Sequence, residues 1–431
     1  MHQNGQVELQ VDDADARAHR WVPSLTLSAC LLAASIALIA AGALLHPHEL
    51  WNELDLLVYR WGGHLVSNGG DLYGVPLGYL PFTYPPFAAL VFAPVDLLPV
   101  GGAQLLMTAA SIASILVSVR AILAISGWPA TRARLSLCLA VSAATLWLEP
   151  VQATLRYGQI NLVLMALVLW DLSRADDRPT KGALVGIAAG MKLTPALFAV
   201  YLLVTGRTRA AAVAAGTFLM TVVVGGLLAP SATSDFWGGL LFLDPKRTGD
   251  VTFVGNQSLR GAALRVFGDT GAVHAAVLVA SLAVAVVGIQ AARRAHRAGH
   301  EAVGILLCAL TGLLVSPISW THHWVWAVPA LACLVATLVQ RPSRRLAVLV
   351  AIGFALLAAW PMHRTLGEPL LPGGVVWLAM DRTGGALAAG FVPMAWSLTY
   401  TLVGLGILVW ASLRYRAEPR AVAAPDALLN A

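Results

Sequence analysis

The chain has 431 residues, of which 58% are hydrophobic and only 12% are charged, and its mean hydropathy is +0.74. A soluble domain carries about a quarter charged residues, so a single soluble core is excluded and an all-α polytopic membrane protein is predicted. The net charge of +6 comes from arginine clusters between apolar runs. This pattern is typical of the positive-inside rule, and we expect no nucleic-acid partner.

The N-terminal region begins with a polar stretch, residues 1–20, which we expect to be a disordered cytoplasmic tail. Ser24 to Leu45 is the first apolar run, and at this length it spans a bilayer and is not expected to be a cleaved signal. Residues 21–416 are predicted to form one transmembrane domain, followed by a second cytoplasmic tail at 417–431. The predicted location is the plasma membrane, with multiple passes.

The stretch from Trp51 to Pro86 is too polar for the bilayer and is predicted to be extracytoplasmic, within a loop at about 47–98. Asp55, Tyr59 and Gly63 recur at intervals of four, so on a short helix they share one face. The Asn-Gly-Gly-Asp sequence at 68–71 ends this helix. A carboxylate placed where water meets lipid is the first candidate for chemistry.

The remaining apolar runs bring the expected total to about eleven to twelve transmembrane helices, with further outer loops at about 230–261 and 361–392. The run at 87–98 is short and interrupted by proline, and we expect it to lie at the outer surface. The other runs are Ala103–Ile125, Leu135–Leu148, Leu162–Leu172, Gly182–Val204, Ala210–Leu228, Val273–Ala291, Ala302–Val315, Val325–Val339, Leu346–Trp360 and Pro393–Leu413.

Polar groups within these runs fall mostly on the outward side, and each needs a partner or a role. Asp55 fits a general base that takes a proton from a hydroxyl, or alternatively an interfacial carboxylate paired with Arg60. Lys192, between Gly190 and Pro195, lies near the middle of its run. It is predicted to bind phosphate at a break in a helix that does not fully cross, although lysines near span ends commonly only extend to the interface.

The pair His322-His323 follows a Ser-Pro break between two apolar runs. These two side chains are candidates to donate hydrogen bonds to a phosphate oxygen. The alternative is that they are interfacial histidines at the start of a helix. No third Cys or carboxylate has zinc-ligand spacing, so we expect no metal. The four cysteines lie in apolar runs without a CxxC pair, and no nucleotide-binding motif is present.

Six short motifs follow one another along the chain. They are Asp55 with Tyr59, DLY at 71–73, FTYPP at 82–86, GQIN at 158–161, KLTP at 192–195 and NQS at 256–258. Taken together, the region 24–416 resembles glycosyltransferase family 87 of the GT-C superfamily. An acidic residue directly after Asp55 is absent, and Glu53 precedes it instead.

The resemblance implies a sugar carried on a lipid monophosphate, transferred at the outer face without nucleotide, cofactor or obligatory metal. It implies that Asp55 is the catalytic base. The likeness is greatest to the α-1,2-mannosyltransferases of the family, which implies a polyprenyl-phosphate mannose donor, a phosphatidylinositol mannoside acceptor, surrounding membrane lipids and an inverting displacement.

The charge that develops on the leaving phosphate predicts cations beside it, and the candidates for donor and phosphate binding are Lys192, Arg260, His322 and His323. The candidates for substrate contact are Tyr59, Tyr84, Gln159, Asn161, Asn256, Gln257 and Trp324.

Three alternatives stay open from the sequence. Relatives within the family transfer arabinose or add mannose to lipoglycan branches. A transporter of lipid-linked sugars also has intramembrane charges and broken helices, but it needs polar groups on both sides of the midplane. A scaffold subunit would not require Asp55, Lys192 and the histidines to converge.

Overall fold

The structure is a computed structural model, and it describes residues 21–239, 241, 247, 249–362, 371–380 and 388–416. Within these ranges the regular secondary structure is almost entirely helical, and the all-α polytopic class predicted from the sequence is confirmed. The predicted tails at 1–20 and 417–431, and parts of the loops at 230–261 and 361–392, lie outside the described residues.

Five segments among the described residues are long and apolar enough to cross a membrane, or up to seven if each of two bent pairs is one span. The bend is 117° in the first of these pairs along the chain and 63° in the second. The long segments are α2 (Leu25–Leu45), α6 (Val100–Ile125), α12 (Thr208–Leu228), α15 (Gly271–Arg297) and η5 with α17 (Thr321–Trp326, Ala327–Gln340). The bent pairs are α8 (Glu149–Tyr157) with α9 (Asn161–Leu172), and α19 (Phe391–Ser397) with α20 (Thr399–Arg414).

The other helices are shorter, and the sequence-based count of about eleven to twelve spans stays a prediction. They are α3 (Pro47–Leu50), α4 (Leu54–Ser67), α5 (Pro86–Asp96), α7 (Arg132–Thr145), α10 (Ala183–Met191), η1 (Thr194–Ala196), α11 (Leu197–Val204), α13 (Pro230–Thr233), the π-helical turn η2 (Ser234–Gly238), α14 (Leu259–Phe267), α16 (Glu301–Val315), α18 (Arg344–Leu357) and η6 (Val375–Ala379). Two short strands, β1 (Trp360–Met362) and β2 (Leu371–Gly373), pair antiparallel with Trp360 opposite Gly373.

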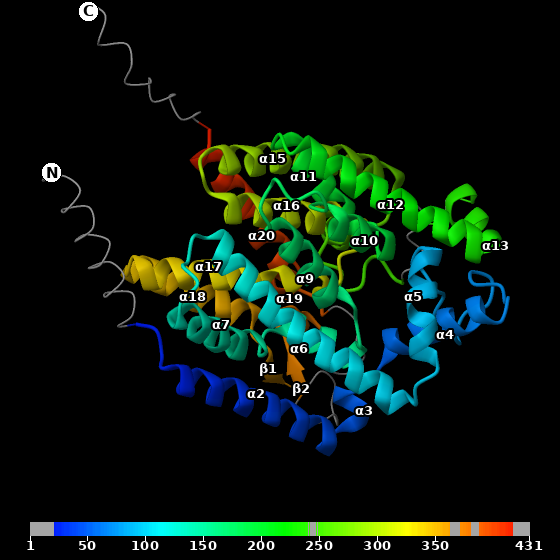
Figure 1. Cartoon of the computed structure of the whole chain (residues 1–431), viewed down its shortest axis with the longest axis horizontal. Coiled ribbons are helices and arrows are strands. Elements are labelled where there is room, and N and C mark those ends of the chain that lie inside the picture. The colour runs from blue at the N-terminus through cyan, green and yellow to red at the C-terminus, as the bar shows by residue number, and fades with distance from the viewer. Residues whose placement is uncertain are drawn as a thin grey trace, which may run out of the picture.

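The elements divide between two ends of the molecule (Figure 1). Helix α2 begins and α20 ends at one end, whereas α3, α4, α5 and α13 lie at the opposite end. The helix predicted around Asp55 is α4, and it ends at Ser67, directly before the Asn-Gly-Gly-Asp sequence. It packs closely on α5, because a Cβ on Gly63 would lie only 2.8 Å from the backbone of Ala93.

The helix break predicted at Lys192 is confirmed. Helix α10 ends at Met191, and Lys192 has an extended backbone with φ −154° and ψ 130°. The chain then makes the turn η1 and continues as α11. Pro195 lacks an N–H and cannot continue the hydrogen-bond ladder across the break. The lysine side chain is thereby released from a helix surface and turns toward other segments.

Candidate active site

A cavity of about 500 Å³, here called the large cavity, opens beside α4. This volume falls within the range of ligand sites in proteins. Its wall is formed by the start of α4, residues 79–85, the α8–α9 break, the α10–η1 break and residues 316–323. Irregular backbone at membrane depth is tolerated where it lines such a cavity, which accounts for two helix breaks meeting here.

Asp55 lines the large cavity from the first turn of α4 and is partly buried. Burial raises the pKa of its carboxyl to about 6, against a hydrogen bond from Gln159 and the charge of Lys192, which both favour the ionised form. A base with a pKa near neutrality is ionised at physiological pH and still accepts a proton readily. The carboxylate therefore has the position and the pKa of a general base.

The residue before α4 fixes the start of this helix. Glu53 has φ 57°, the single described non-glycine residue with a left-handed backbone, and this conformation is uncommon for residues with a Cβ. Its N–H donates to the carbonyl of Arg156 at 3.0 Å. The strained residue thus ties the start of α4, and with it Asp55, to α8.

Two buried tyrosines orient the amide that faces Asp55. The Tyr59 hydroxyl lies 2.8 Å from Gln159 Oε1, to which it donates, and 2.9 Å from the Tyr84 hydroxyl. Asn161 also donates to Gln159 Oε1 at 3.3 Å. Because the amide oxygen is occupied by these donors, the amide NH₂ of Gln159 is left to donate to the Asp55 carboxylate.

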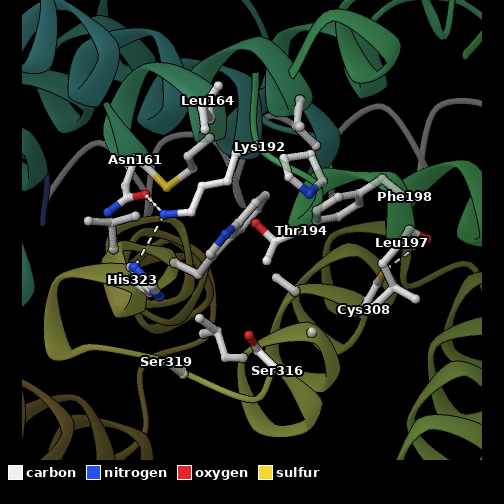
Figure 2. A pocket seen from close by; sticks show the side chains of 18 residues that line it. Asn161, Leu164, Lys192, Thr194, Leu197, Phe198, Cys308, Ser316, Ser319 and His323 are labelled. Atoms are coloured by element: carbon white, nitrogen blue, oxygen red, sulfur yellow. Dashed lines mark hydrogen bonds between the residues drawn. The ribbon is translucent and has the colours of Figure 1, made fainter. Parts of the chain in front are cut away.

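Lys192 lies at the centre of a second polar group, shown in Figure 2. Its Nζ lies 2.9 Å from Asn161 Oδ1 and 3.2 Å from His323 Nε2, and 5.4 Å from the centre of the Tyr84 ring. An ammonium has only donors, so His323 Nε2 accepts and its ring is neutral. Asn161 Nδ2 donates to the carbonyl of His322 at 3.1 Å. The cation is therefore held at the wall of the cavity.

His322 also lines the large cavity, where its ring meets that of Tyr157 edge-on at 5.6 Å. Its Nε2 is buried and has no hydrogen-bond partner among the described residues. A buried polar atom without a partner is uncommon in proteins. This nitrogen is available to a ligand in the cavity.

A smaller cavity of about 60 Å³, here called the small cavity, is shown in Figure 2. It adjoins the large one, because the two share lining residues. Its wall consists of side chains from α9, η1, α11, α16 and the η5–α17 segment. Lys192, Thr194, Ser316 and His323 line both cavities. The lysine therefore stands at their junction.

Of the residues predicted from the sequence, eight line the large cavity or bond directly through their side chains to a residue that does. Tyr59 and Asn161 reach the site through their hydrogen bonds, and Asn161 itself lines the small cavity. The residues that line the large cavity directly are Asp55, Tyr84, Gln159, Lys192, His322 and His323.

Besides Tyr59, four predicted residues line neither cavity: Arg260, Asn256, Gln257 and Trp324. Asn256 Oδ1 accepts the Ser319 N–H at 2.9 Å, and Gln257 Nε2 donates to the Ser397 carbonyl at 2.8 Å. Trp324 packs against Tyr400, with ring centres 5.4 Å apart. Asn256 thus bonds the backbone near His322, whereas the side chains of Gln257 and Trp324 contact α19 and α20. Substrate contact by these three residues, and phosphate binding by Arg260 on α14, stay predictions.

Sequence reasoning missed one cation at the large cavity. Arg247 lines it and donates to the carbonyls of Tyr73 at 3.1 Å and Phe82 at 3.4 Å. The sequence signal for Arg247 was its position in the predicted outer loop at 230–261. Arg260 lies in the same loop and carries the same charge, so this signal could not distinguish the two arginines. Trp320 also lines the large cavity and presents an indole ring on which a sugar can stack.

Comparison with known proteins identifies the chain. Residues 82–317 match glycosyltransferase family 87. The chain belongs to this family. The protein is thus a multi-pass membrane glycosyltransferase, as the sequence predicted, and the transporter and scaffold alternatives are not retained. No solved structure matches.

The family 87 chain is similar to curated mycobacterial enzymes. It is 36% identical over 411 residues to a polyprenol-phosphate-mannose-dependent alpha-(1-2)-phosphatidylinositol pentamannoside mannosyltransferase of Mycobacterium tuberculosis, covering 91% of this chain and 89% of that one. The enzyme of the same description in Mycolicibacterium smegmatis is 37% identical over 322 residues, with 73% and 76% covered. A phosphatidylinositol mannoside mannosyltransferase of M. tuberculosis is 33% identical over 327 residues, with 72% and 76% covered.

Proposed function

We propose that the protein transfers mannose from polyprenyl-phosphate mannose to a phosphatidylinositol mannoside, forming an α-1,2 linkage. The descriptions of its relatives support the donor and the acceptor. The observation that carries the mechanism is that a carboxylate, Asp55, and a cation, Lys192, line one cavity. A base and a cation are what an acceptor hydroxyl and a leaving phosphate require.

The reaction is a single displacement. Asp55 takes the proton of the acceptor hydroxyl as its oxygen bonds to the anomeric carbon of mannose. The bond from that carbon to the phosphate oxygen breaks, and the electron pair leaves with the polyprenyl phosphate. Attack opposite the leaving group inverts the anomeric centre, so a β-linked donor gives an α-linked product.

The departing phosphate gains a negative charge, which Lys192 stabilises. A preorganised donor aimed at developing charge lowers the barrier more than one that must reorient, and Asn161 and His323 hold Nζ in place. The free Nε2 of His322 supplies a further group toward the phosphate or the sugar. Product release returns the Asp55 proton to water.

The site is proposed to face the extracytoplasmic side. Helix α15 ends in a basic turn that contains Arg294 and Arg297, and α18 begins with Arg344 and Arg345. Basic clusters favour the cytoplasmic side. Helices α4 and α5 lie at the other end of the molecule from the start of α2 (Figure 1).

The test uses purified protein in lipid nanodiscs with polyprenyl-phosphate mannose and a panel of phosphatidylinositol mannosides. We expect one added mannose, released by an α-1,2-specific mannosidase, and a loss of about 10²–10⁴-fold in Asp55→Asn. Glu53→Gln is the matched control and should stay close to wild type. Transfer from polyprenyl-phosphate arabinose instead of the mannose donor, or full activity of Asp55→Asn, would overturn the donor or the base respectively.

A further inference from the structure

The small cavity differs from the large one in chemistry. Its deep wall is formed by the buried side chains of Leu164, Met165 and Val168 on α9, with Phe198 and Cys308 opposite. Lys192 is the single charged residue among the described lining residues, and it lies at the junction with the large cavity. An apolar space with a cation at its entrance fits a molecule that joins a hydrocarbon chain to an anion.

The donor in the proposed function has this composition, with its phosphate between sugar and lipid. If Lys192 binds the phosphate, the sugar and the lipid, which are both bonded to that phosphate, must extend from it in different directions. The large cavity holds Asp55 and has room for sugar and acceptor. The small cavity (Figure 2) adjoins it and shares Lys192 as a lining residue, so it offers a separate space for the lipid.

We propose that the small cavity binds the first isoprene unit of the donor lipid, next to its phosphate. This inference rests on the proposed function and assigns a separate binding site within it. A single water needs about 10–15 Å³ of such a cavity, so a volume of about 60 Å³ leaves room for a small hydrocarbon group. One isoprene unit has five carbons. The branched methyl group fills width that an unbranched chain leaves empty.

The chain continues from the small cavity toward lipid along a rim of partly exposed residues. Leu197 on α11 and Gly312 and Leu313 on α16 are all partly exposed and line the cavity. Thr194 and Ser316 line both cavities and offer hydroxyl groups beside the phosphate position. The donor thus enters between α11 and α16 with its phosphate stopping at Lys192.

A glycine on the rim allows a test. A Cβ on Gly312 would meet only Leu197 Cδ2, at 3.4 Å, so a larger side chain is tolerated there but narrows the rim. Gly406 on α20 has no atom within 4 Å of such a Cβ, so Gly406→Leu is the matched control. Each buried CH₂ group contributes a factor of about four to binding, so Gly312→Leu should raise the donor KM about tenfold and leave the acceptor KM unchanged.

Two mannosyl phosphates with the same number of lipid carbons, one isoprenoid and one unbranched, complete the experiment. Wild type and Gly406→Leu should prefer the isoprenoid, and Gly312→Leu should lose this preference. A rise in acceptor KM in Gly312→Leu would instead assign the cavity to the acceptor's acyl chain. Unchanged kinetics with intact transfer would also overturn the inference, whereas no mannose transfer by wild type would overturn the proposed function.

A binding experiment is independent of turnover. Polyprenyl phosphate with a diazirine in its first isoprene unit should label the elements that line the small cavity, namely α9, α11, α16 or the η5–α17 segment, in wild type and in Asp55→Asn. Labelling confined to other helices would contradict the assignment.

Discussion

Lys192 Nζ donates to Asn161 Oδ1 at 2.9 Å, across 31 positions of sequence. Each residue stands at the end of an interrupted helix, because Asn161 begins α9 after a 117° bend and Lys192 follows α10 directly. The bond therefore joins two helix breaks whose residues line the large cavity. An ammonium has three N–H groups, and Asn161 and His323 take two of them. The third remains for an anion.

Replacing this lysine tests the anion site. Lys192→Met keeps an unbranched side chain that ends where the lysine has Cε, and it removes the charge. We expect kcat to fall about 10²–10³-fold, as for the loss of one oxyanion donor. Radiolabelled transfer in nanodiscs measures it. Asn161→Leu retains the charge of Lys192 but removes one of the groups that hold its Nζ in place, so kcat should fall less than in Lys192→Met. Activity of Lys192→Met within threefold of wild type would remove the cation from the mechanism.

The pKa of Asp55 sets the acid limb of the pH profile. The base works only when ionised, and burial raises its pKa to about 6. We expect kcat/KM to rise tenfold per pH unit below about pH 6 and to level off above it. A profile of the free enzyme that is flat between pH 5 and 7 would contradict this assignment.

The amide of Gln159 gives a matched variant for the same profile. Its hydrogen bond favours the ionised carboxyl and holds the pKa of Asp55 below the value that burial alone would give. In Gln159→Leu the acid limb should therefore move to higher pH, not lower. A general loss of fold would reduce activity at every pH without moving the limb, so the midpoint distinguishes the two effects.

Glu149 is predicted to stabilise the segment that carries the histidines. This fully buried carboxylate accepts hydrogen bonds from Thr321 at 2.8 Å, Trp377 at 3.0 Å and Tyr400 at 3.0 Å. Glu149→Leu leaves three buried donors without this acceptor, and a hydrogen bond to a charged group contributes about 1.5–3 kcal/mol. We expect a clearly lower thermal midpoint in detergent.

Tyr400→Phe is the graded control for this carboxylate. It removes one of the three donors and leaves the other two bonds in place, so its midpoint should lie between those of wild type and Glu149→Leu. Equal midpoints for Glu149→Leu and wild type would show that the carboxylate does not hold these segments together.

Local sequence patterns predicted the elements that carry the site. The spacing of Asp55, Tyr59 and Gly63 predicted a helix with one functional face, because residues four positions apart lie on the same face of an α-helix. The Gly and Pro around Lys192 predicted a break, because these residues limit helices locally. Both features depend on near neighbours in the chain.

Contacts between residues that are far apart in the chain could not be predicted from the sequence. Asn256 and Gln257 were predicted to touch substrate as polar residues in apolar surroundings, but a buried amide needs hydrogen bonds whether or not it meets a ligand. Here the bonds go to the backbone at Ser319 and Ser397. Arg260 and Arg247 have the same side chain in the same loop, and only tertiary packing places Arg247 at the cavity.

The orientation of the site is open to chemical labelling. Ser67 ends α4 beside the proposed outer face, and Ser343 precedes the basic start of α18; both are exposed. In intact cells a membrane-impermeant maleimide should label Ser67→Cys and should label Ser343→Cys only after permeabilisation. The two substitutions are isosteric, and the unsubstituted chain corrects for the native cysteines, of which Cys30 is exposed. The reverse labelling pattern would place Asp55 on the cytoplasmic side of the membrane. The donor would then have to present its mannose in the inner leaflet, and the proposed extracytoplasmic site would be wrong.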